Sequence, residues 1–361
     1  MFSYGGDSGA VFSLAQSIAS SMQDAQVRGC EMVLRSSISV GAAARSVSSK
    51  NSFEQATKRL VQNMLKSMHI RLESQLFYGQ VGIAKVASIA TNTITICAAE
   101  WAAGIWAGAK NMKVQIRSQA GTLRGSATVD SIDLDAKTIT LDAAPVGVTG
   151  NVDPENAAAD IIWYDGAYNK EFAGLHKMIT NTGTIFNIDA SQYELFRGNV
   201  ILGGTNATSG AVFLSFDLIE KAVTRAMEKG LMDEDVTALV NPKHWDKLLS
   251  DLNAKRQIDS SYSSKQIEEG ANSIKFHGQN GTIEIVSSLF VKEGFAYVLP
   301  PKELERIGST EVTFQMPGVE EGRFFRLLND ENGYELRLYT DQSLFCGVLG
   351  QLSVIKYLKT A

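Results

Sequence analysis

The sequence has 361 residues, of which 44% are hydrophobic and 20% are charged, and its formal net charge is −5. This composition excludes a disordered chain, a collagen-like repeat and a small disulfide scaffold. It suffices for a large core or for two to three smaller ones. The negative charge argues against a protein whose main task is to grip nucleic-acid phosphates, because such proteins carry an excess of lysine and arginine.

Targeting and redox signals are few. No run of about eighteen apolar residues occurs, so no membrane-spanning helix is expected. The N-terminus has no basic segment followed by a continuous apolar one, so it does not read as a secretory signal. The three cysteines are far apart in the sequence, which favours a reducing cytoplasm over a disulfide framework.

Residues 1–52 differ from the rest of the chain, because 13 of them are serine. Apolar side chains nevertheless keep helical spacing at Val11, Leu14, Ile18 and Met22. Two interpretations stay open: a mobile leader with a transient helix, or an arm that lies on a neighbouring subunit and buries its apolar face there.

The segment 53–78 carries the strongest helical pattern of the sequence. Ser52 and Gln55 form a capping-box pattern before it, and Gly79 ends it. Such a helix is about 39 Å long at ~1.5 Å per residue. It is either an ordinary long core helix or a support across which other parts of the protein lie. Its apolar positions recur every three or four residues: Phe53, Ala56, Leu60, Met64, Met68, Leu72 and Leu76.

Between residues 81 and 165 the apolar period changes to two, which predicts strands. Two similar hairpins, 86–96 and 129–141, together with strands at 112–117 and 160–164, predict a compact barrel-like β-module. We expect Asp133 and Asp135 to form a turn, since a calcium loop would also need a glycine and a terminal glutamate. Trp101 and Trp106 are expected in the core of this module.

The rest of the chain alternates between irregular and regular segments. Residues 166–214 are glycine-rich and irregular, without the spacing of a phosphate-binding loop. A helix starting at Ser215 and ending at Gly230 is followed by a strand at 236–240 and by a helix that Asn241 caps. The remaining expectations are a polar loop at 253–273 and then strands at 281–286, 295–299, 311–316, 323–328, 334–345 and 351–358.

The sequence contains no catalytic motif. The histidines His69, His176, His244 and His277 are isolated and lack metal-ligand spacing, so they are expected to be surface or packed residues. We therefore predict no catalytic, cofactor-binding or metal-binding residue, and no cofactor. If the protein were instead an enzyme, its site would lie between the β-module and residues 215–290, with Asp233, Glu234 and His244 as the nearest candidates.

The order of elements resembles the major capsid proteins of tailed bacteriophages, whose shell fold is shared with herpesviruses. The resemblance rests on the serine-rich arm, the long helix ending in Leu76-Phe-Tyr-Gly-Gln80, and the segments FDLIEKAVTRAMEKG, TALVNPKHWDKLL and TIEIVSSLFVKEGFAYVLPPKEL. It implies an α+β fold with these parts: N-terminal arm and extended loop (1–52, with the loop around 27–52), spine helix of a peripheral domain (53–80), inserted β-module (81–165), mainly axial domain (166–290) and return strands of the peripheral domain (291–361).

The same resemblance implies a function. The protein would self-assemble as pentamers and hexamers into the icosahedral head that encloses double-stranded DNA, after assembly in the host bacterial cytoplasm. Its partners would be other copies of itself, a separate scaffolding protein, a portal and decoration proteins, and no membrane. Not every member carries the β-module, which we hypothesise decorates the outside of the shell.

Four cations of the long helix are the expected contacts to neighbouring subunits or to DNA: Lys58, Arg59, Lys66 and Arg71. A tail or decoration protein is an alternative function, although the long helix disfavours it. The enzyme described above is a less favoured alternative.

Overall fold

The computed structural model describes residues 3, 11, 14–16, 23–41, 50–232, 234–250, 273–279, 281–315, 324–328 and 332–360. These residues form a mixed α+β fold with a four-stranded sheet, a six-stranded sheet and a closed barrel, beside a small two-stranded sheet. The predicted α+β class is therefore confirmed. All but the last residue of the loop expected at 253–273 lies outside the described residues. Ile18 and Met22 of the expected N-terminal helix also lie outside them. Val11 and Leu14 are exposed and are not helical.

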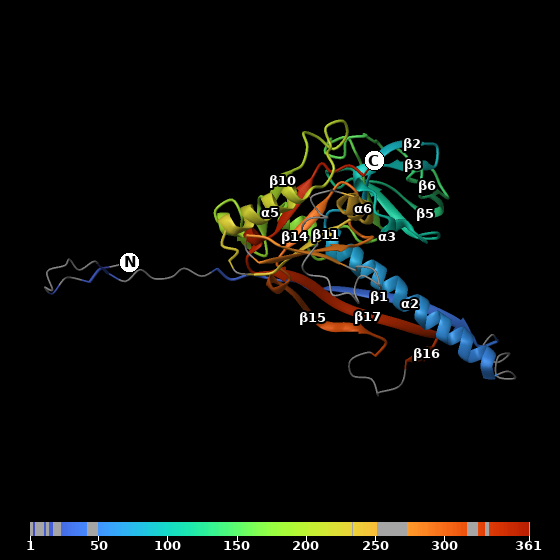
Figure 1. Cartoon of the computed structure of the whole chain (residues 1–361). Helices are drawn as coiled ribbons and strands as arrows, with labels where there is room; N and C mark the ends of the chain where they lie inside the picture. Colours follow the sequence, from blue (N-terminus) through green and yellow to red (C-terminus); the bar gives the residue numbers. More distant parts are fainter. Residues whose placement is uncertain are drawn as a thin grey trace.

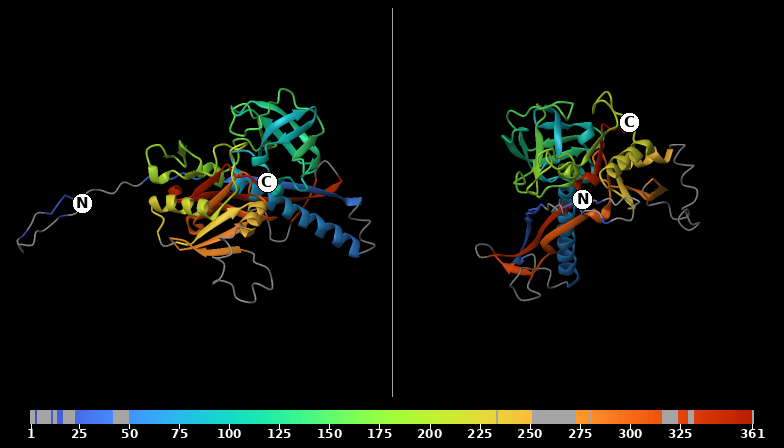
Figure 2. Two further views of the ribbon diagram at one scale, coloured as in Figure 1. Left: turned by 45° about the horizontal axis from the view of Figure 1, so that its top comes forward. Right: turned by 90° about the vertical axis from the view of Figure 1, so that its left-hand side faces the viewer.

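A long helix and the four-stranded sheet form a part that we call the wing, which projects from the rest of the molecule (Figures 1 and 2). The helix α2 spans Lys50–Tyr78, so it begins before the position that the capping-box pattern predicted and ends where expected. The wing sheet has the order β1-β17-β15, with β16 also paired to β17. Its strands are β1 (Cys30–Ser39), β15 (Leu304–Thr313), β16 (Phe325–Leu327) and β17 (Gly333–Cys346).

The apolar stripe of α2 packs on this sheet. Met64, Met68 and Leu72 are buried against Leu336 and Leu338 of β17. Burying such side chains is the main source of stability for a helix that lies on a sheet. The sequence did not predict β1, which falls in the segment expected to be an extended loop and pairs antiparallel with β17 along its length.

The predicted β-module is a closed six-stranded barrel with the order β2-β3-β6-β5-β4-β7. Its turn at Asp133 is confirmed, because the Asp133 carboxylate accepts hydrogen bonds from the backbone N–H groups of Asp135 and Ala136. Trp101 and Trp106 are buried with ring centroids 6.0 Å apart. The strands are β2 (Ala84–Ala90), β3 (Thr93–Ile96), β4 (Lys113–Arg117), β5 (Leu123–Asp133), β6 (Thr138–Leu141) and β7 (Ile161–Tyr164); η1 (Ala98–Glu100) and α3 (Ala103–Trp106) follow β3.

The six-stranded sheet, which we call the body sheet, has the order β10-β18-β14-β11-β13-β12. The boundary expected at residue 291 does not separate two sheets, because β14 and β18 pair in this sheet with strands from before that residue. The strands are β10 (Asn199–Leu202), β11 (Val236–Val240), β12 (Ser273–His277), β13 (Thr282–Ser287), β14 (Ala296–Leu299) and β18 (Ser353–Lys356).

Two helices adjoin the body sheet as predicted. α5 (Phe216–Glu228) is capped by the Ser215 hydroxyl, which accepts from the backbone N–H of Leu218 at 3.4 Å. α6 (Pro242–Ser250) is capped by the Asn241 side chain, which accepts from the N–H of Lys243 at 3.0 Å. The segment 166–214 is mostly irregular, with only short elements: α4 (Leu175–Ile179), β8 (Thr184–Ile185), β9 (Ile188–Asp189), η2 (Glu194–Phe196) and β10.

Candidate functional site

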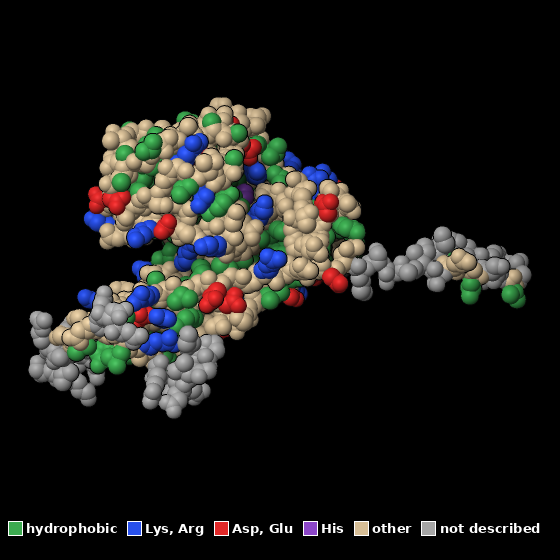
Figure 3. All heavy atoms as spheres, turned by 180° about the vertical axis from the view of Figure 1, so that it is seen from behind, with side chains coloured by type: hydrophobic (Ala, Val, Ile, Leu, Met, Phe, Trp, Pro, Cys, Tyr) green, Lys and Arg blue, Asp and Glu red, His purple; other side chains and the backbone are tan. Residues whose placement is uncertain are grey.

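The wing exposes apolar side chains that a globular subunit would bury. Leu327 is 71% exposed and lies opposite Tyr334 in the β16–β17 pair. Phe325 and Phe324 are 43% and 42% exposed. Figure 3 shows hydrophobic side chains at the surface at the outer end of the wing, next to lysine and arginine side chains. Contiguous apolar surface of this kind usually marks a protein–protein interface.

Three of the four predicted contact cations are available to a partner. Lys58, Arg59 and Lys66 are exposed on α2. Arg71 is less accessible than these three residues. Its side chain is 22% exposed, and its Nη2 lies 2.9 Å from Oε1 of Glu171.

The Arg71 guanidinium also lies over the ring of Tyr164, 3.5 Å from the centroid. Tyr164 belongs to the barrel, and Glu171 follows it in the chain, so Arg71 fastens α2 to the barrel side of its own subunit. Burial raises the pKa of Glu171, and the neighbouring Arg71 opposes that rise.

A buried ion pair joins the barrel to the body sheet. Lys292, in the connection between β13 and β14, places Nζ 2.5 Å from Oε2 of Glu100, and both side chains are almost fully buried. The ammonium also donates to the Gly82 carbonyl and lies 4.1 Å from the ring centroid of Tyr78. Burial by itself would raise the pKa of Glu100, but Lys292 and Lys85 outweigh it and lower that pKa, so the carboxylate stays charged.

The surrounding aromatic groups keep this pair dry. The Tyr78 hydroxyl accepts from the backbone N–H of Lys292 at 2.8 Å. Nδ1 of His176 lies 2.9 Å from the Tyr297 hydroxyl. Burial lowers the pKa of His176 to about 3, so this histidine is neutral near pH 7 and adds no charge to the cluster.

The next residue, Glu293, links three further parts of the chain. Its carboxylate accepts from Lys137 of the barrel at 2.8 Å, from Lys243 of α6 at 2.8 Å and from the Thr360 hydroxyl at 2.7 Å. Burial raises the pKa of Glu293, but these three hydrogen bonds together outweigh it, and the pKa is lowered. The barrel is therefore held to the body by directional contacts as well as by a shared core.

Backbone hydrogen bonds complete this junction. The N–H groups of Glu293 and Gly294 donate to the carbonyls of Trp101 and Ala99 at 2.9 and 2.8 Å. The sequence contained one signal for the buried charges: Lys292 and Glu293 interrupt the apolar run LFVKEGFAYVL. It contained no signal that paired them with Glu100 or Lys137.

Of the residues considered for an enzyme site, the two described ones, Glu234 and His244, do not line the cavity that lies beside β10. His244 is buried, and its Nε2–H donates to the Glu293 backbone carbonyl at 2.7 Å; burial lowers its pKa. Glu234 is half-buried, and Asp233 lies outside the described residues. His176 is also packed, whereas His69 and His277 are exposed. Within the described ranges, no group of three or more His, Cys, Asp or Glu side chains could hold a metal ion.

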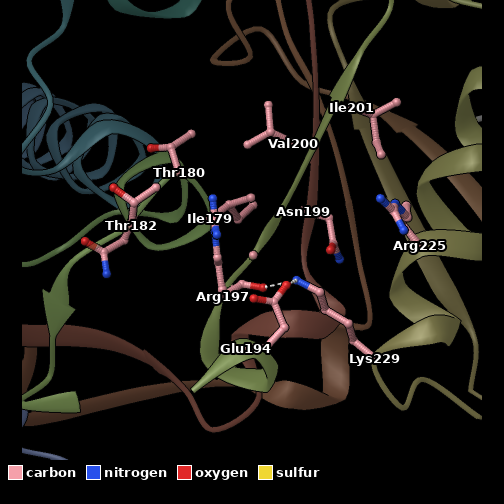
Figure 4. Close-up of a pocket in the computed structure, with 12 residues that line it drawn as sticks. Ile179, Thr180, Thr182, Glu194, Arg197, Asn199, Val200, Ile201, Arg225 and Lys229 are labelled. Carbon is pink, nitrogen blue, oxygen red and sulfur yellow. Dashed lines mark hydrogen bonds and ion pairs between the residues drawn. The ribbon is translucent and has the colours of Figure 1, made fainter. Parts of the chain in front are cut away.

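A cavity of about 320 Å³ lies beside β10, between the C-terminal end of α4 and the C-terminal half of α5 (Figure 4). Lys229 Nζ approaches Oε1 of Glu194 at 3.2 Å and donates to the Arg197 carbonyl at 2.8 Å. Arg197 and Arg225 also line it, together with Thr180 and Thr182. Cations and hydroxyl groups thus form part of the lining, beside the Glu194 carboxylate and the apolar Ile179, Val200 and Ile201. Nowhere in the described part of the chain is a helix long and apolar enough to cross a membrane.

No family model matches the chain, and no curated protein matches it. Among solved structures, it is similar to a chain of the satellite phage P4 procapsid including the size determination (Sid) protein, with 8% identity over 99% of this chain and 79% of that one and a TM-score of 0.42. The cyanophage A-1(L) capsid has 15% identity over 53% of this chain and 61% of that one, with a TM-score of 0.39. The chain therefore spans less than two thirds of the cyanophage protein.

The capsid of Ralstonia phage GP4 has 13% identity over 50% of this chain and 57% of that one, with a TM-score of 0.31. These three structures are phage capsids, which is the class that the order of elements in the sequence resembles; the similar solved structures also include a virus-like particle from Pyrococcus furiosus and an encapsulin from Synechococcus elongatus. Each of these TM-scores lies below 0.5, so the function has to be argued from the chain's own surfaces.

Proposed function

We propose that this protein is the subunit of a viral shell, and specifically the major capsid protein of a tailed bacteriophage. Copies would associate as pentamers and hexamers into an icosahedral head that encloses double-stranded DNA. The observation that carries the proposal is the wing: a long helix fastened along a sheet, which projects from the body and exposes apolar side chains at its outer end. Such a part gains burial only against a neighbouring molecule.

The parts of the fold take roles in this proposal. α2 is the spine helix of the peripheral domain, and β1, β15, β16 and β17 are the strands beside it. The region 166–290, with α5, α6 and part of the body sheet, is the axial domain, and residues before β1 are the N-terminal arm. In this proposal the barrel lies on the outside of the shell. Lys58, Arg59 and Lys66 are the candidates for contacts with neighbours or with DNA.

A negatively charged chain suits this task, because it can enclose a polyanion without gripping it. The partners in the proposal are other copies of the chain, a separate scaffolding protein, a portal and decoration proteins. Assembly takes place in the bacterial cytoplasm, and the product is part of the virion.

The test is electron microscopy of the purified chain and of a lysate from infected cells. We expect pentamers, hexamers or closed polyhedral shells in at least one of the two samples. Phe325→Ser combined with Leu327→Ser should prevent assembly and leave the subunit folded, since both side chains are already exposed. The matched control is Leu123→Ser on the barrel, where a 49% exposed leucine is replaced outside the wing.

Two results would contradict the proposal. A small oligomer of fixed size in both samples would favour the alternative that the protein is an enzyme. Attachment of the chain to shells made of another protein would instead identify a decoration protein. Charge reversal at Arg59 and Lys66 that leaves assembly and packaging unchanged would remove these two residues from the proposed contacts.

A further inference from the structure

The strand β10 forms an open edge of the body sheet. Among the described strands it pairs with β18 alone, in parallel register, and it ends the strand order on that side. The N–H groups of Asn199 and Gly203 donate to carbonyls of the β18 side, each at 2.9 Å. Because alternate residues of a parallel strand bond to the same neighbour, the backbone groups of Val200 and Leu202 point away from β18. Among the described residues, none is hydrogen-bonded to these outward groups.

The side chains at this edge are apolar and accessible. Val200 is 43% exposed and Leu202 is 56% exposed. Edge strands are commonly protected by lysine, proline or a bulge, because bare backbone groups next to apolar side chains attract another strand. β10 is short, with four residues, which itself gives some protection, but its sequence, Asn-Val-Ile-Leu, contains no lysine or proline and its pairing with β18 has no bulge. Its edge therefore has the chemistry of a strand-addition site.

The cavity beside β10 adds a charge preference. Arg197 is exposed at its rim, and Arg225 and Lys229 of α5 line one wall (Figure 4). Glu194 pairs with Lys229, and Glu228 pairs with Arg225. The three cations therefore exceed these two carboxylates by one positive charge. A strand laid along β10 would run beside these groups, so acidic side chains on it would be favoured.

We propose that the β10 edge binds an extended, acidic peptide segment of a partner protein by strand addition. The backbone of the segment pairs with Val200 and Leu202, its apolar residues cover these two side chains, and its carboxylates approach Arg197 and Arg225. This interaction is additional to the proposed shell function, since it needs only the folded subunit.

The experiment measures amide hydrogen exchange on the full chain, kept dilute, with two capped synthetic pentapeptides, Val-Glu-Val-Glu-Val and Val-Lys-Val-Lys-Val. We expect the glutamate peptide to slow exchange at Val200 and Leu202 and to bind about fivefold or more tightly than the lysine peptide, as exposed ion pairs predict. Arg197→Glu should remove most of that preference without affecting folding, because its side chain is exposed.

Val200→Pro tests the backbone contact directly. Its N–H points outward, so proline at this position keeps the β18 ladder and should abolish peptide binding. Ile201→Pro is the contrasting variant, because it removes an N–H on the β18 side and should destabilise the sheet.

Three outcomes would overturn the proposal. Neither peptide slows amide exchange at Val200 and Leu202, the two peptides bind equally well, or exchange there slows without any peptide when the chain is concentrated. The last would show that a second copy covers the edge. If Val200→Pro fails to fold, the proposal is still tested by whether Arg197→Glu loses the preference for the glutamate peptide over the lysine peptide.

Discussion

Lys292 Nζ and Glu100 Oε2 lie 2.5 Å apart inside the core, although 192 residues separate them in the chain. One belongs to the connection that enters β14, and the other to the short helix η1 that follows β3 of the barrel. Both side chains are almost fully buried, so removing either charge leaves the other uncompensated in the core. The pair therefore makes the barrel and the body depend on each other.

The first prediction concerns this pair. Lys292→Met leaves the Glu100 carboxylate buried without a counter-charge and should lower the free energy of unfolding by about 3–5 kcal/mol. Adding Glu100→Leu should recover most of the loss, because an apolar pair of similar size removes the uncompensated charge. Urea unfolding of the single and double variants measures both values. A double variant as unstable as the single one would contradict the argument.

The second prediction concerns pH. The pKa of Glu293 is lowered in the folded protein, so the residue contributes stability above its ordinary value of 4.5 and loses that contribution as the pH falls through the folded value. We expect the wild-type protein to lose stability on acidification more steeply than Glu293→Gln, which cannot titrate. Unfolding followed between about pH 6 and pH 3 gives the two slopes. Parallel slopes would rule out this role for Glu293.

The third prediction separates two cations of α2. Arg71→Ala leaves the buried Glu171 carboxylate without its partner and should lower the free energy of unfolding by about 2 kcal/mol. Lys66→Ala, the matched control on the same helix, removes an exposed charge and should change stability by less than about 0.5 kcal/mol. Equal effects of the two changes would contradict the different environments that the structure gives these residues.

The fourth prediction tests the packing of the wing. Met68→Ala opens a cavity between α2 and β17 and should lower the free energy of unfolding by about 2–4 kcal/mol. Gln62→Ala, on the exposed side of the same helix, is the control and should be nearly neutral. If both variants unfold at the same urea concentration as the wild type, the wing does not unfold together with the body.

The fifth prediction addresses the barrel as a whole. Barrel residues such as Val86 and Ile116 belong to the same buried cluster as Tyr297 and Val354 of the body sheet. Removing residues 84–164 and joining the ends with a glycine–serine linker also deletes Glu100 and Lys137. We therefore expect loss of soluble protein. Recovery of closed particles from this deletion would contradict the argument that the barrel and the body share one core.

Much of the fold could be predicted because the signals were local. The apolar stripe of α2, the two barrel hairpins and the caps at Ser215 and Asn241 all depend on residues close together in the sequence, and the structure confirms them. β1 escaped prediction because Ser36 interrupts the apolar residues on its inward side and the apolar Val33 lies on its exposed side, so the alternation is weak. Its strand conformation depends on pairing with β17, at the other end of the chain.

The contacts between the barrel and the body could not be predicted either, because they also join residues that lie far apart in the sequence. Nothing near Glu100 indicates that it is buried, since its counter-charge comes from a distant loop. Arg71 is a second example: it lies outside the apolar stripe of α2, but Glu171 and Tyr164 contact it there and leave its side chain partly buried. Helix periodicity distinguishes polar from apolar faces and does not reveal which polar face a second structural unit will cover.

The position of β18 has a consequence for synthesis. This strand lies between β10 and β14 in the body sheet, and its partner β10 precedes it by about 150 residues. Until Ser353–Lys356 leave the ribosome, β10 lacks the strand with which it pairs in the described structure, and β14 has one unpaired edge. Contacts this distant form late and slowly. A chain interrupted before β18 therefore lacks a finished body sheet.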